Sequence, residues 1–208
     1  MERFIVVDYH AGNLTSVLNA FGHLGISVKA SSDPSEIAEA DRLIFPGVGA
    51  ARSAMETLEN SGIGNAIFRV VERKRPVLGI CIGCQIVLQS SEENGGVKCL
   101  GLIDGKAVRF REEPGIKIPQ MGWNQVDFLK DHPLFEGIPD GSDFYFVHSY
   151  HPDSIAAENA LARTTFGSQS FVSAICRENL VATQFHLEKS GDVGLRVLKN
   201  FSAWSGVC

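Results

Sequence analysis

The sequence predicts an α/β protein with a mainly parallel central sheet flanked by helices, and with a β-rich second half added to it. Up to Gly95, short apolar runs alternate with stretches whose apolar residues recur at helical spacing. This alternation is typical of βαβ crossovers and of a parallel sheet covered on both faces. After Gly96, short apolar runs follow one another between Gly, Pro and Asp turns, which indicates strands.

The first half opens with a strand that ends at Asp8, followed by a helix whose C-cap is Gly25. In order, the predicted strands are Phe4–Val7, Ile26–Ala30, Arg42–Phe45 and Val77–Ile80, and the predicted helices are Leu14–Leu24, Pro34–Ala40, Ser53–Leu58 and Ala66–Arg73. The second half, from Leu100 to Gln184, is predicted to contain strands such as Ala107–Phe110, Phe144–Val147, Phe171–Ile175 and Leu180–Gln184, before a last helix at Val193–Trp204. Because neither an internal repeat nor a linker interrupts the chain, we expect residues 1–208 to form a single domain.

Composition excludes several classes of protein. The chain has 208 residues, of which 44% are hydrophobic and 21% charged, as in ordinary globular proteins. Its formal net charge of -5, without a long basic run, argues against a nucleic-acid-binding surface. The apolar run at Phe4–Val7 is too short for a signal peptide or a membrane span, so a cytoplasmic protein is expected. The five cysteines are odd in number and irregularly spaced, so we expect most of them to be reduced thiols rather than a disulfide framework.

The most informative stretch is GICIGCQ, at residues 79–85. It joins a predicted buried strand to a predicted helix, and Gly79 and Gly83 flank Cys81 with the spacing of a nucleophile elbow. Glycines tolerate the close approach that such a turn requires. The free N–H groups at the start of a helix favour a thiolate and can stabilise an oxyanion. Cys81 is therefore predicted to attack a carbonyl carbon.

A thiolate nucleophile needs a base, and His186 is the strongest candidate among six histidines. It ends a predicted strand, and Glu188 follows two residues later. Because residues i and i+2 of an extended segment point the same way, the Glu188 carboxylate is expected to orient the imidazole. Cys81, His186 and Glu188 are the predicted catalytic residues.

Three other interpretations of these residue types are less favoured. Cys81 and Cys84 have the spacing of a redox pair, but Cys84 is expected to pack in the core, and a second cysteine cluster that would complete a zinc site is missing. His148 and His151 suggest a metal pair, although hydrogen-bonded structural histidines are commoner. Gly47-Val48-Gly49 resembles part of a dinucleotide loop, but Arg52 replaces its third glycine. We therefore expect neither a metal nor a cofactor.

The stretches LGICIGCQ, PGVGAA at residues 46–51 and QFHLEKSG at residues 184–191 resemble class I glutamine amidotransferases, whose hallmarks are G-x-C-x-G-x-Q and a later H-x-E. The resemblance implies the class I amidotransferase fold and a reaction in which the cysteine attacks the side-chain amide of glutamine. Ammonia is released, and water clears the glutamyl thioester. Further stretches, VVDYHAGN, SSEENGG, IPQMGWNQV and FYFVHSYHP, are similar to one branch of this family, the glutaminase subunits of imidazole glycerol phosphate synthases in histidine biosynthesis.

That branch implies a heterodimer with a cyclase subunit, a (βα)8 barrel that receives the ammonia. It also implies roles for matching residues of this chain. The implied glutamine-binding residues are Gln85, Glu93, Ser149 and Tyr150. The implied oxyanion donors are the N–H of Ile82 and, after a peptide rearrangement, an N–H of the loop with Val48 and Gly49. The implied interface residues are Gly122, Trp123, Asn124 and Lys189.

Four residues depart from the usual pattern of this branch. Leu187 replaces a proline, which would leave its loop less restrained, and Cys84, Ile82 and Gln120 replace a methionine, a leucine and a histidine. None of these changes removes a predicted catalytic side chain. Two alternatives remain open: a paralogous glutaminase that supplies another acceptor, for example in a sugar nucleotide pathway, and a non-catalytic α/β module whose cysteines sense oxidants.

Overall fold

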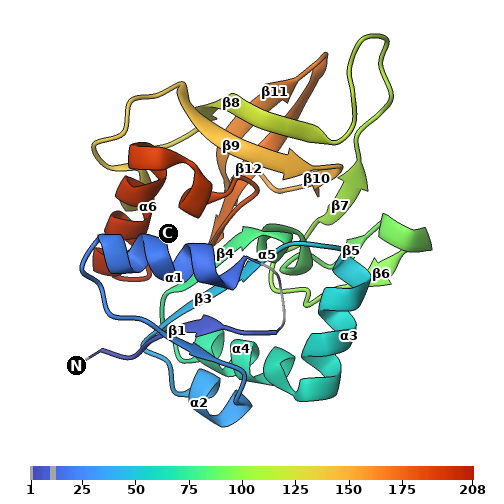
Figure 1. Ribbon diagram of the computed structural model, residues 1–208. Helices are drawn as coiled ribbons and strands as arrows, with labels where there is room; N and C mark the ends of the chain where they lie inside the picture. Colours follow the sequence, from blue (N-terminus) through green and yellow to red (C-terminus); the bar gives the residue numbers. More distant parts are fainter. Residues whose placement is uncertain (1, 10–12) are drawn as a thin grey trace.

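A nine-stranded sheet runs through the molecule (Figure 1), in a computed structural model that describes residues 2–9 and 13–208. One half is parallel and consists, in spatial order, of β2 (Lys29–Ser31), β1 (Phe4–Val7), β3 (Arg42–Gly47), β4 (Val77–Cys81) and β13 (Leu180–Thr183). The other half is antiparallel and continues with β12 (Gln169–Arg177), β11 (Ala160–Phe166), β8 (Gln120–Phe128) and β9 (Ser142–His148).

A smaller sheet lies beside the large one. Its spatial order is β10 (Tyr150–Asp153), β7 (Lys106–Arg109), β5 (Ser90–Ser91) and β6 (Val97–Lys98). Three short 3-10 turns connect elements of the chain: η1 (Glu93–Gly95), η2 (Pro133–Phe135) and η3 (Leu187–Lys189).

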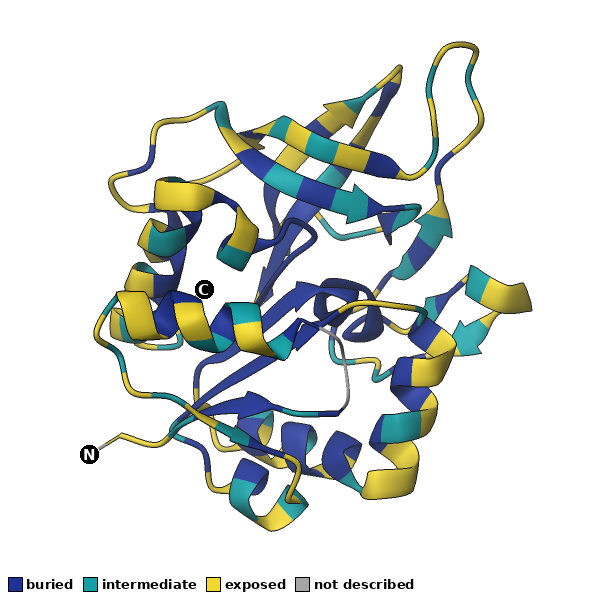
Figure 2. Ribbon diagram, viewed as in Figure 1, coloured by how far each residue is buried: buried dark blue, intermediate teal, exposed yellow. Residues whose placement is uncertain are grey.

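Helices cover both faces of the parallel half. The helices α1 (Leu14–His23) and α6 (Gly191–Ala203) pack on one face, and α2 (Pro34–Ala38), α3 (Ala51–Ser61), α4 (Ile63–Glu72) and α5 (Ile82–Ile86) pack on the other. Successive strand residues divide between the two layers: Ile5 and Val7 join the cluster under α3 and α4, whereas Val6 joins the cluster under α1 and α6. This period of two explains why the central strands are buried along their whole length (Figure 2).

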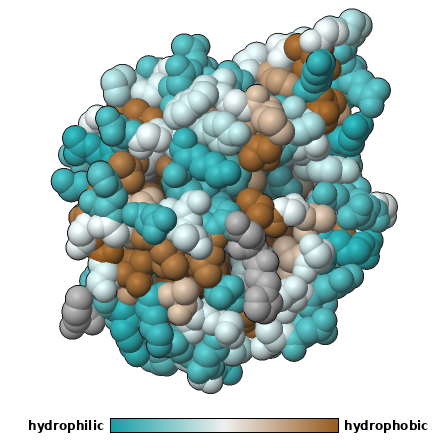
Figure 3. Space-filling model, in the orientation of Figure 1, coloured by the Kyte–Doolittle hydropathy of each residue, from teal (hydrophilic) through white to brown (hydrophobic). Residues whose placement is uncertain are grey.

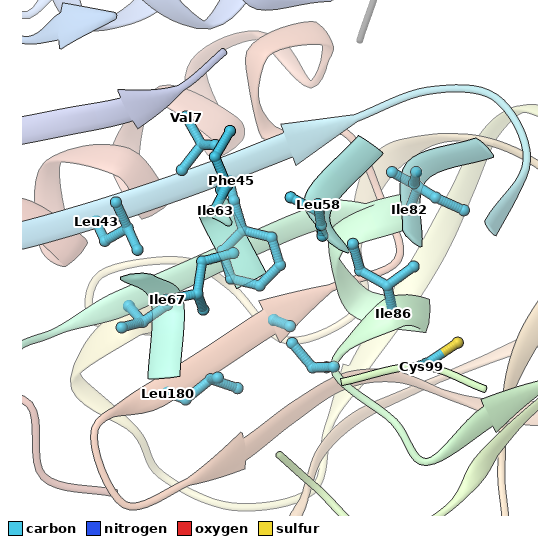
Figure 4. Close-up of a cluster of buried hydrophobic side chains, with 14 of the residues drawn as sticks. Val7, Leu43, Phe45, Leu58, Ile63, Ile67, Ile82, Ile86, Cys99 and Leu180 are labelled. Atoms are coloured by element: carbon cyan, nitrogen blue, oxygen red, sulfur yellow. The ribbon is translucent and has the colours of Figure 1, made fainter. Parts of the chain in front are cut away.

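The layer formed by α3, α4 and α5 contains one of the two hydrophobic clusters, in which Phe45 of β3 lies among Leu58, Ile63 and Ile67 (Figure 4). Helices α3 and α4 are separated by Gly62, whose φ of +76° suits a residue without a Cβ. On the opposite layer, hydrophobic side chains gather on the surface over α1 (Figure 3), where Leu14 and Leu18 are only partly buried.

The predicted fold class is confirmed, and several boundaries were wrong. Strand β2 begins at Lys29 rather than Ile26, and β3 runs through Pro46 to Gly47 rather than stopping at Phe45. The long strand β8 was not predicted at all. Its residues alternate between buried and exposed, but the sequence QMGWNQVDF has too few apolar residues to show that pattern.

The structure joins Cys176 and Cys208 in a disulfide and leaves Cys81, Cys84 and Cys99 as free thiols. The prediction that most cysteines are reduced therefore agrees with the structure, while this one bridge was not predicted. Within residues 2–9 and 13–208, no helix has the length and apolar character needed to cross a membrane.

Candidate active site

A pocket of about 370 Å³ opens where the parallel strands end. Strand β4 ends at Cys81, β3 ends at Gly47 beside it, and β13 leads into Gln184 and His186. In open α/β sheets, ligands bind outside the carboxyl ends of the strands. The pocket is lined by Val48, Gly49, Cys81, Ile82, Gln85, Glu93, Pro119, Val147, His148, Ser149 and Tyr150. A larger hollow of about 880 Å³, lined by residues between Phe128 and Asp140, contains none of the predicted site residues.

Cys81 occupies a strained turn, as the elbow spacing predicts. Its φ of 56° and ψ of -104° are unusual for a residue with a side chain. Both flanking glycines are required by close packing: a Cβ on Gly79 would lie 3.0 Å from the backbone of Gly83, and a Cβ on Gly83 would lie 2.5 Å from the carbonyl oxygen of Phe45. Helix α5, which follows, is only five residues long, so Cys81 faces free N–H groups rather than a long helix dipole.

His186 and Glu188 form a buried pair. The imidazole Nδ1 lies 2.7 Å from Glu188 Oε1, and both side chains are inaccessible to solvent. The predicted contact is therefore present, although the predicted reason was wrong, because Glu188 lies in the turn η3 and not on an extended segment. The His186 backbone is fixed on both sides, since its N–H donates to the Tyr145 carbonyl at 2.9 Å and its carbonyl accepts from the Ser190 hydroxyl at 2.6 Å.

The charges around His186 favour its protonated form. Burial alone would lower the pKa of the imidazole, but the neighbouring Cys81 and Glu188, each as an anion, outweigh it and raise the pKa from 6.5 to about 10. His186 Nε2 makes no hydrogen bond to any atom in the described part of the chain. Among the groups that raise the pKa of the imidazole, the charge of Cys81 has the largest effect.

Asn13 is a member of this group that the sequence analysis missed. Its side-chain Nδ2 donates to Glu188 Oε1 at 2.6 Å and lies 3.3 Å from His186 Nδ1. Glu188 Oε1 is therefore held by two donors, the Asn13 amide and the imidazole. The only signal in the sequence was the position of Asn13 within the stretch VVDYHAGN; residues 10–12 of that stretch lie outside the described residues.

Gln184 is a second missed residue, and it connects Cys81 to Gln85. Its Nε2 approaches Cys81 Sγ at 3.9 Å, while its Oε1 accepts from Gln85 Nε2 at 3.1 Å. Gln85 Nε2 also donates to the Tyr150 carbonyl at 2.9 Å. Gln85, implied to hold the substrate, thus also orients the amide that faces the thiol. Gln184 was visible in the stretch QFHLEKSG, two residues before His186.

The remaining residues implied in glutamine binding line the same pocket. Glu93 accepts a hydrogen bond from the Ala51 N–H at 2.6 Å, which fixes its carboxylate beside the start of α3. Ser149 and Tyr150 also line the pocket, and the Ser149 carbonyl accepts from the Phe110 N–H at 3.0 Å. A carboxylate side chain and the Ser149–Tyr150 segment therefore line the same pocket.

The loop after β3 supplies the implied oxyanion residues. Val48, Gly49 and Ile82 all line the pocket, and Gly49 has a φ of +100°, which glycine adopts without strain. A side chain at Gly47 would collide with Ile82 and with the buried hydroxyl of Tyr9. This packing keeps the loop backbone directly beside the nucleophile.

The four implied interface residues do not line the pocket. Gly122, Trp123 and Asn124 lie on β8, where Trp123 is 58% exposed and its neighbour Met121, which the sequence analysis missed, is 67% exposed. The Trp123 ring contacts Tyr145 at 6.0 Å between centroids, and Tyr145 contacts His186 at 6.5 Å. Lys189 Nζ lies over the same Tyr145 ring at 5.8 Å. A continuous row of rings thus connects the exposed face to His186.

The other cysteines and histidines near the pocket are structural. Cys84 is fully buried, and burial raises the pKa of its thiol well above the ordinary value. His148 Nδ1 pairs with the Tyr150 carbonyl at 2.7 Å, and His151 Nδ1 with the Pro152 carbonyl at 3.0 Å. These bonds match the structural interpretation of the two histidines. Neither residue belongs to a group of three potential metal ligands anywhere in the described chain.

A parallel sheet with a strained cysteine at a strand end and a buried His–Glu pair beside it defines a cysteine-dependent hydrolase site. The chain belongs to the class-I glutamine amidotransferase family, whose model matches residues 5–203. It is thus a glutamine amidotransferase, as predicted.

The more specific similarity is to subunits of one enzyme. The chain is 49% identical over 196 residues to the imidazole glycerol phosphate synthase subunit HisH of Dehalococcoides mccartyi (strain CBDB1), covering 94% of each chain. It is 45% identical to the subunit of the same name from Acinetobacter baylyi (strain ATCC 33305 / BD413 / ADP1), covering 99% of this chain and all of that relative. A solved glutamine amidotransferase structure is only 18% identical but has a TM-score of 0.75 over 98% of this chain and 99% of that one, which supports the fold.

Proposed function

We propose that this protein is the glutaminase subunit of an imidazole glycerol phosphate synthase. It hydrolyses glutamine to glutamate and ammonia and passes the ammonia to a cyclase subunit in histidine biosynthesis. The observation that carries the proposal is Cys81, held on its strained elbow beside the buried His186–Glu188 pair. The names of its relatives, which cover nearly the whole chain, favour the histidine-pathway enzyme over a paralogue with another acceptor. We further propose that it is a single cytoplasmic domain.

In the first half of the reaction, the Cys81 thiolate attacks the carboxamide carbon of glutamine. The His186 imidazolium, favoured by its raised pKa, donates its proton to the departing nitrogen, and ammonia leaves. The product on the enzyme is a glutamyl thioester. In the second half, neutral His186 removes a proton from water, which attacks the thioester and releases glutamate and the Cys81 thiolate. Glu188 orients the imidazole and stabilises its charged form in both halves.

The carbonyl oxygen of glutamine becomes an oxyanion in both tetrahedral intermediates. The Ile82 N–H and an N–H of the Val48–Gly49 loop are the proposed donors. Glu93 offers a carboxylate to the α-amino group of glutamine, while Gln85, Ser149 and Tyr150 contact its remaining polar groups.

The cyclase is proposed to dock on the face with Gly122, Trp123, Asn124 and Lys189. An exposed tryptophan next to an exposed methionine is typical of the centre of a protein interface. Through Tyr145, a partner pressing on Trp123 or Lys189 acts one ring away from His186. Docking is therefore expected to stimulate glutamine hydrolysis, including through rearrangement of the Val48 peptide.

Glutamate release from glutamine, measured with and without the cyclase subunit and its ligand, tests the proposal. Cys81→Ala should abolish release, whereas Cys84→Ala, which removes a buried thiol three residues away, should retain most of it. An active Cys81→Ala variant would contradict the nucleophile assignment. Equal rates with and without the cyclase would contradict the proposed partner, and product analysis with other acceptor enzymes would then identify the paralogue.

A further inference from the structure

Away from the pocket, two cysteines and a histidine converge on one point. Cys176, near the end of β12, is 1% exposed, whereas Cys208, beyond α6, is exposed. The disulfide between them spans 32 residues with a Cα–Cα distance of 6.2 Å, within the usual range. His132 Nε2 lies 3.9 Å from Cys176 Sγ, and the two sulfurs and the histidine nitrogen all lie within 4.8 Å of one another. None of these three residues lines the active pocket.

The hydrogen bonds of His132 determine which of its two ring nitrogens carries the proton. Its Nδ1 accepts the backbone N–H of Leu134 at 3.1 Å. Burial, with a smaller effect of Lys130, lowers the pKa of His132 to about 4, so the ring is neutral near pH 7. A neutral ring whose Nδ1 is an acceptor carries its proton on Nε2. The N–H that faces Cys176 can therefore donate to its sulfur.

This tautomer argues against a metal ion between the three residues. A metal would need the lone pair of Nε2, and the ring proton would then have to lie on Nδ1. Nδ1, however, faces an amide N–H rather than an acceptor. A thiolate at Cys176 fits the site better, because an anionic sulfur accepts the Nε2–H without any change of the ring.

We propose that Cys176 and Cys208 form a reversible disulfide that exchanges with small thiols of the glutathione class, with His132 stabilising the departing Cys176 thiolate. A thiolate attacks Sγ of the exposed Cys208, a mixed disulfide forms there, and the electron pair of the broken bond remains on Cys176 Sγ. A second thiolate releases Cys208, so that two small thiols become one small disulfide and the protein gains two thiols. The reverse sequence, driven by a small disulfide, closes the bridge.

The surrounding contacts allow exchange without unfolding. The Cys208 N–H donates to the Glu178 carbonyl at 3.0 Å, and Trp204 Nε1 donates to the Val207 carbonyl at 3.0 Å. Trp204 itself is anchored by Arg42, whose guanidinium donates to its carbonyl at 2.6 Å. The segment after α6 therefore has non-covalent anchors that remain after reduction. Because Cys208 is exposed and Cys176 is buried, an incoming thiolate is directed to the Cys208 sulfur.

The test uses the full-length protein equilibrated in buffers with different ratios of reduced to oxidised glutathione, then acid-quenched, alkylated and mapped by mass spectrometry. Alkylation of Cys176 and Cys208 should rise and fall together and reversibly with the ratio, while that of the buried Cys84 and Cys99, whose thiol pKa values are raised by burial, should not follow it. Reduction should lower the Tm of the wild type by several degrees, because the link closes a 32-residue segment, and should leave the Tm of Cys208→Ser unchanged.

His132→Asn separates the proposed donor from its structural role. An asparagine oxygen can still accept the Leu134 N–H, but the side chain cannot supply an N–H at the position of Nε2. Reduction by glutathione should slow about tenfold, the loss expected for one hydrogen bond to a charged sulfur. An unchanged rate would overturn the role of His132. The proposed exchange itself would be overturned by either of two results. The reduced fraction of the Cys176–Cys208 disulfide could stay constant as the glutathione ratio changes, or one equivalent of Zn²⁺ could protect both thiols from alkylation. Glutamine turnover is not a readout, so these outcomes are independent of the proposed function.

Discussion

Replacing Asn13 tests whether the catalytic pair needs a third buried group. In Asn13→Ala, Glu188 Oε1 loses a donor at 2.6 Å and keeps, among residues 2–9 and 13–208, the imidazole at 2.7 Å. A hydrogen bond to a charged group contributes about 1.5–3 kcal/mol. Since about 1.4 kcal/mol corresponds to a tenfold change in rate, kcat/KM for glutamine should fall roughly 10- to 100-fold. The loss should appear mainly in kcat, because Asn13 does not line the substrate pocket.

The assay is glutamate release over a range of glutamine concentrations, with Tm measured in parallel to detect damage to the fold. Asn13→Asp is the matched variant, since it keeps the size of the side chain but places a second carboxylate against Glu188. Its activity should be lowest where both carboxylates are ionised and should recover partly at lower pH, where a protonated Asp can donate. If Asn13→Ala kept its kcat within twofold of the wild type, or if Asn13→Asp behaved like the wild type at every pH, Asn13 would have no positioning role.

Three further changes have expected outcomes. Glu188→Gln removes one of the charges that raise the pKa of His186 to about 10. Because the imidazolium is lost as pH rises through that pKa, the alkaline limb of the kcat/KM profile should move to lower pH. An alkaline limb at the wild-type pH would contradict the coupling between Glu188 and His186. Gly83→Ala places a Cβ 2.5 Å from the Phe45 carbonyl oxygen. Overpacking of about 1–3 kcal/mol should lower the Tm in thermal melting by roughly 3–10 °C. An unchanged Tm would mean that the backbone around Gly83 is less tightly packed than described. Trp123→Ala should weaken cyclase binding, measured by calorimetry, about 30-fold with little change in Tm, as expected for an aromatic residue at the centre of an interface. Leu129 is another exposed apolar residue, and Leu129→Ala should not weaken binding. Equal effects of the two substitutions would argue against the β8 face as the docking site.

The elbow and the His–Glu pair could be predicted because their signals are local. Gly79 and Gly83 stand two residues on either side of Cys81, and His186 and Glu188 are separated by one residue, so short stretches are sufficient to recognise them. The strands of the parallel half were recognisable for a similar reason, since burial on both faces requires continuous apolar runs. Strand β8 lacks such a run and was missed, together with the exposed Met121 that it presents.

The sequence by itself therefore determined the fold class, the elbow at Cys81 and the His186–Glu188 contact, because each depends on residues close together in the chain. Only the tertiary structure decided which distant groups surround them. Asn13 reaches Glu188 across 175 positions, Gln184 reaches Cys81 across 103, and His132 reaches Cys176 across 44. These contacts arise where separate segments meet after packing, and no periodicity or motif within one segment encodes such a meeting. The structure likewise assigned Cys176 and Cys208 to each other, since pairing of cysteines depends on their distance in space and not on their spacing in the chain.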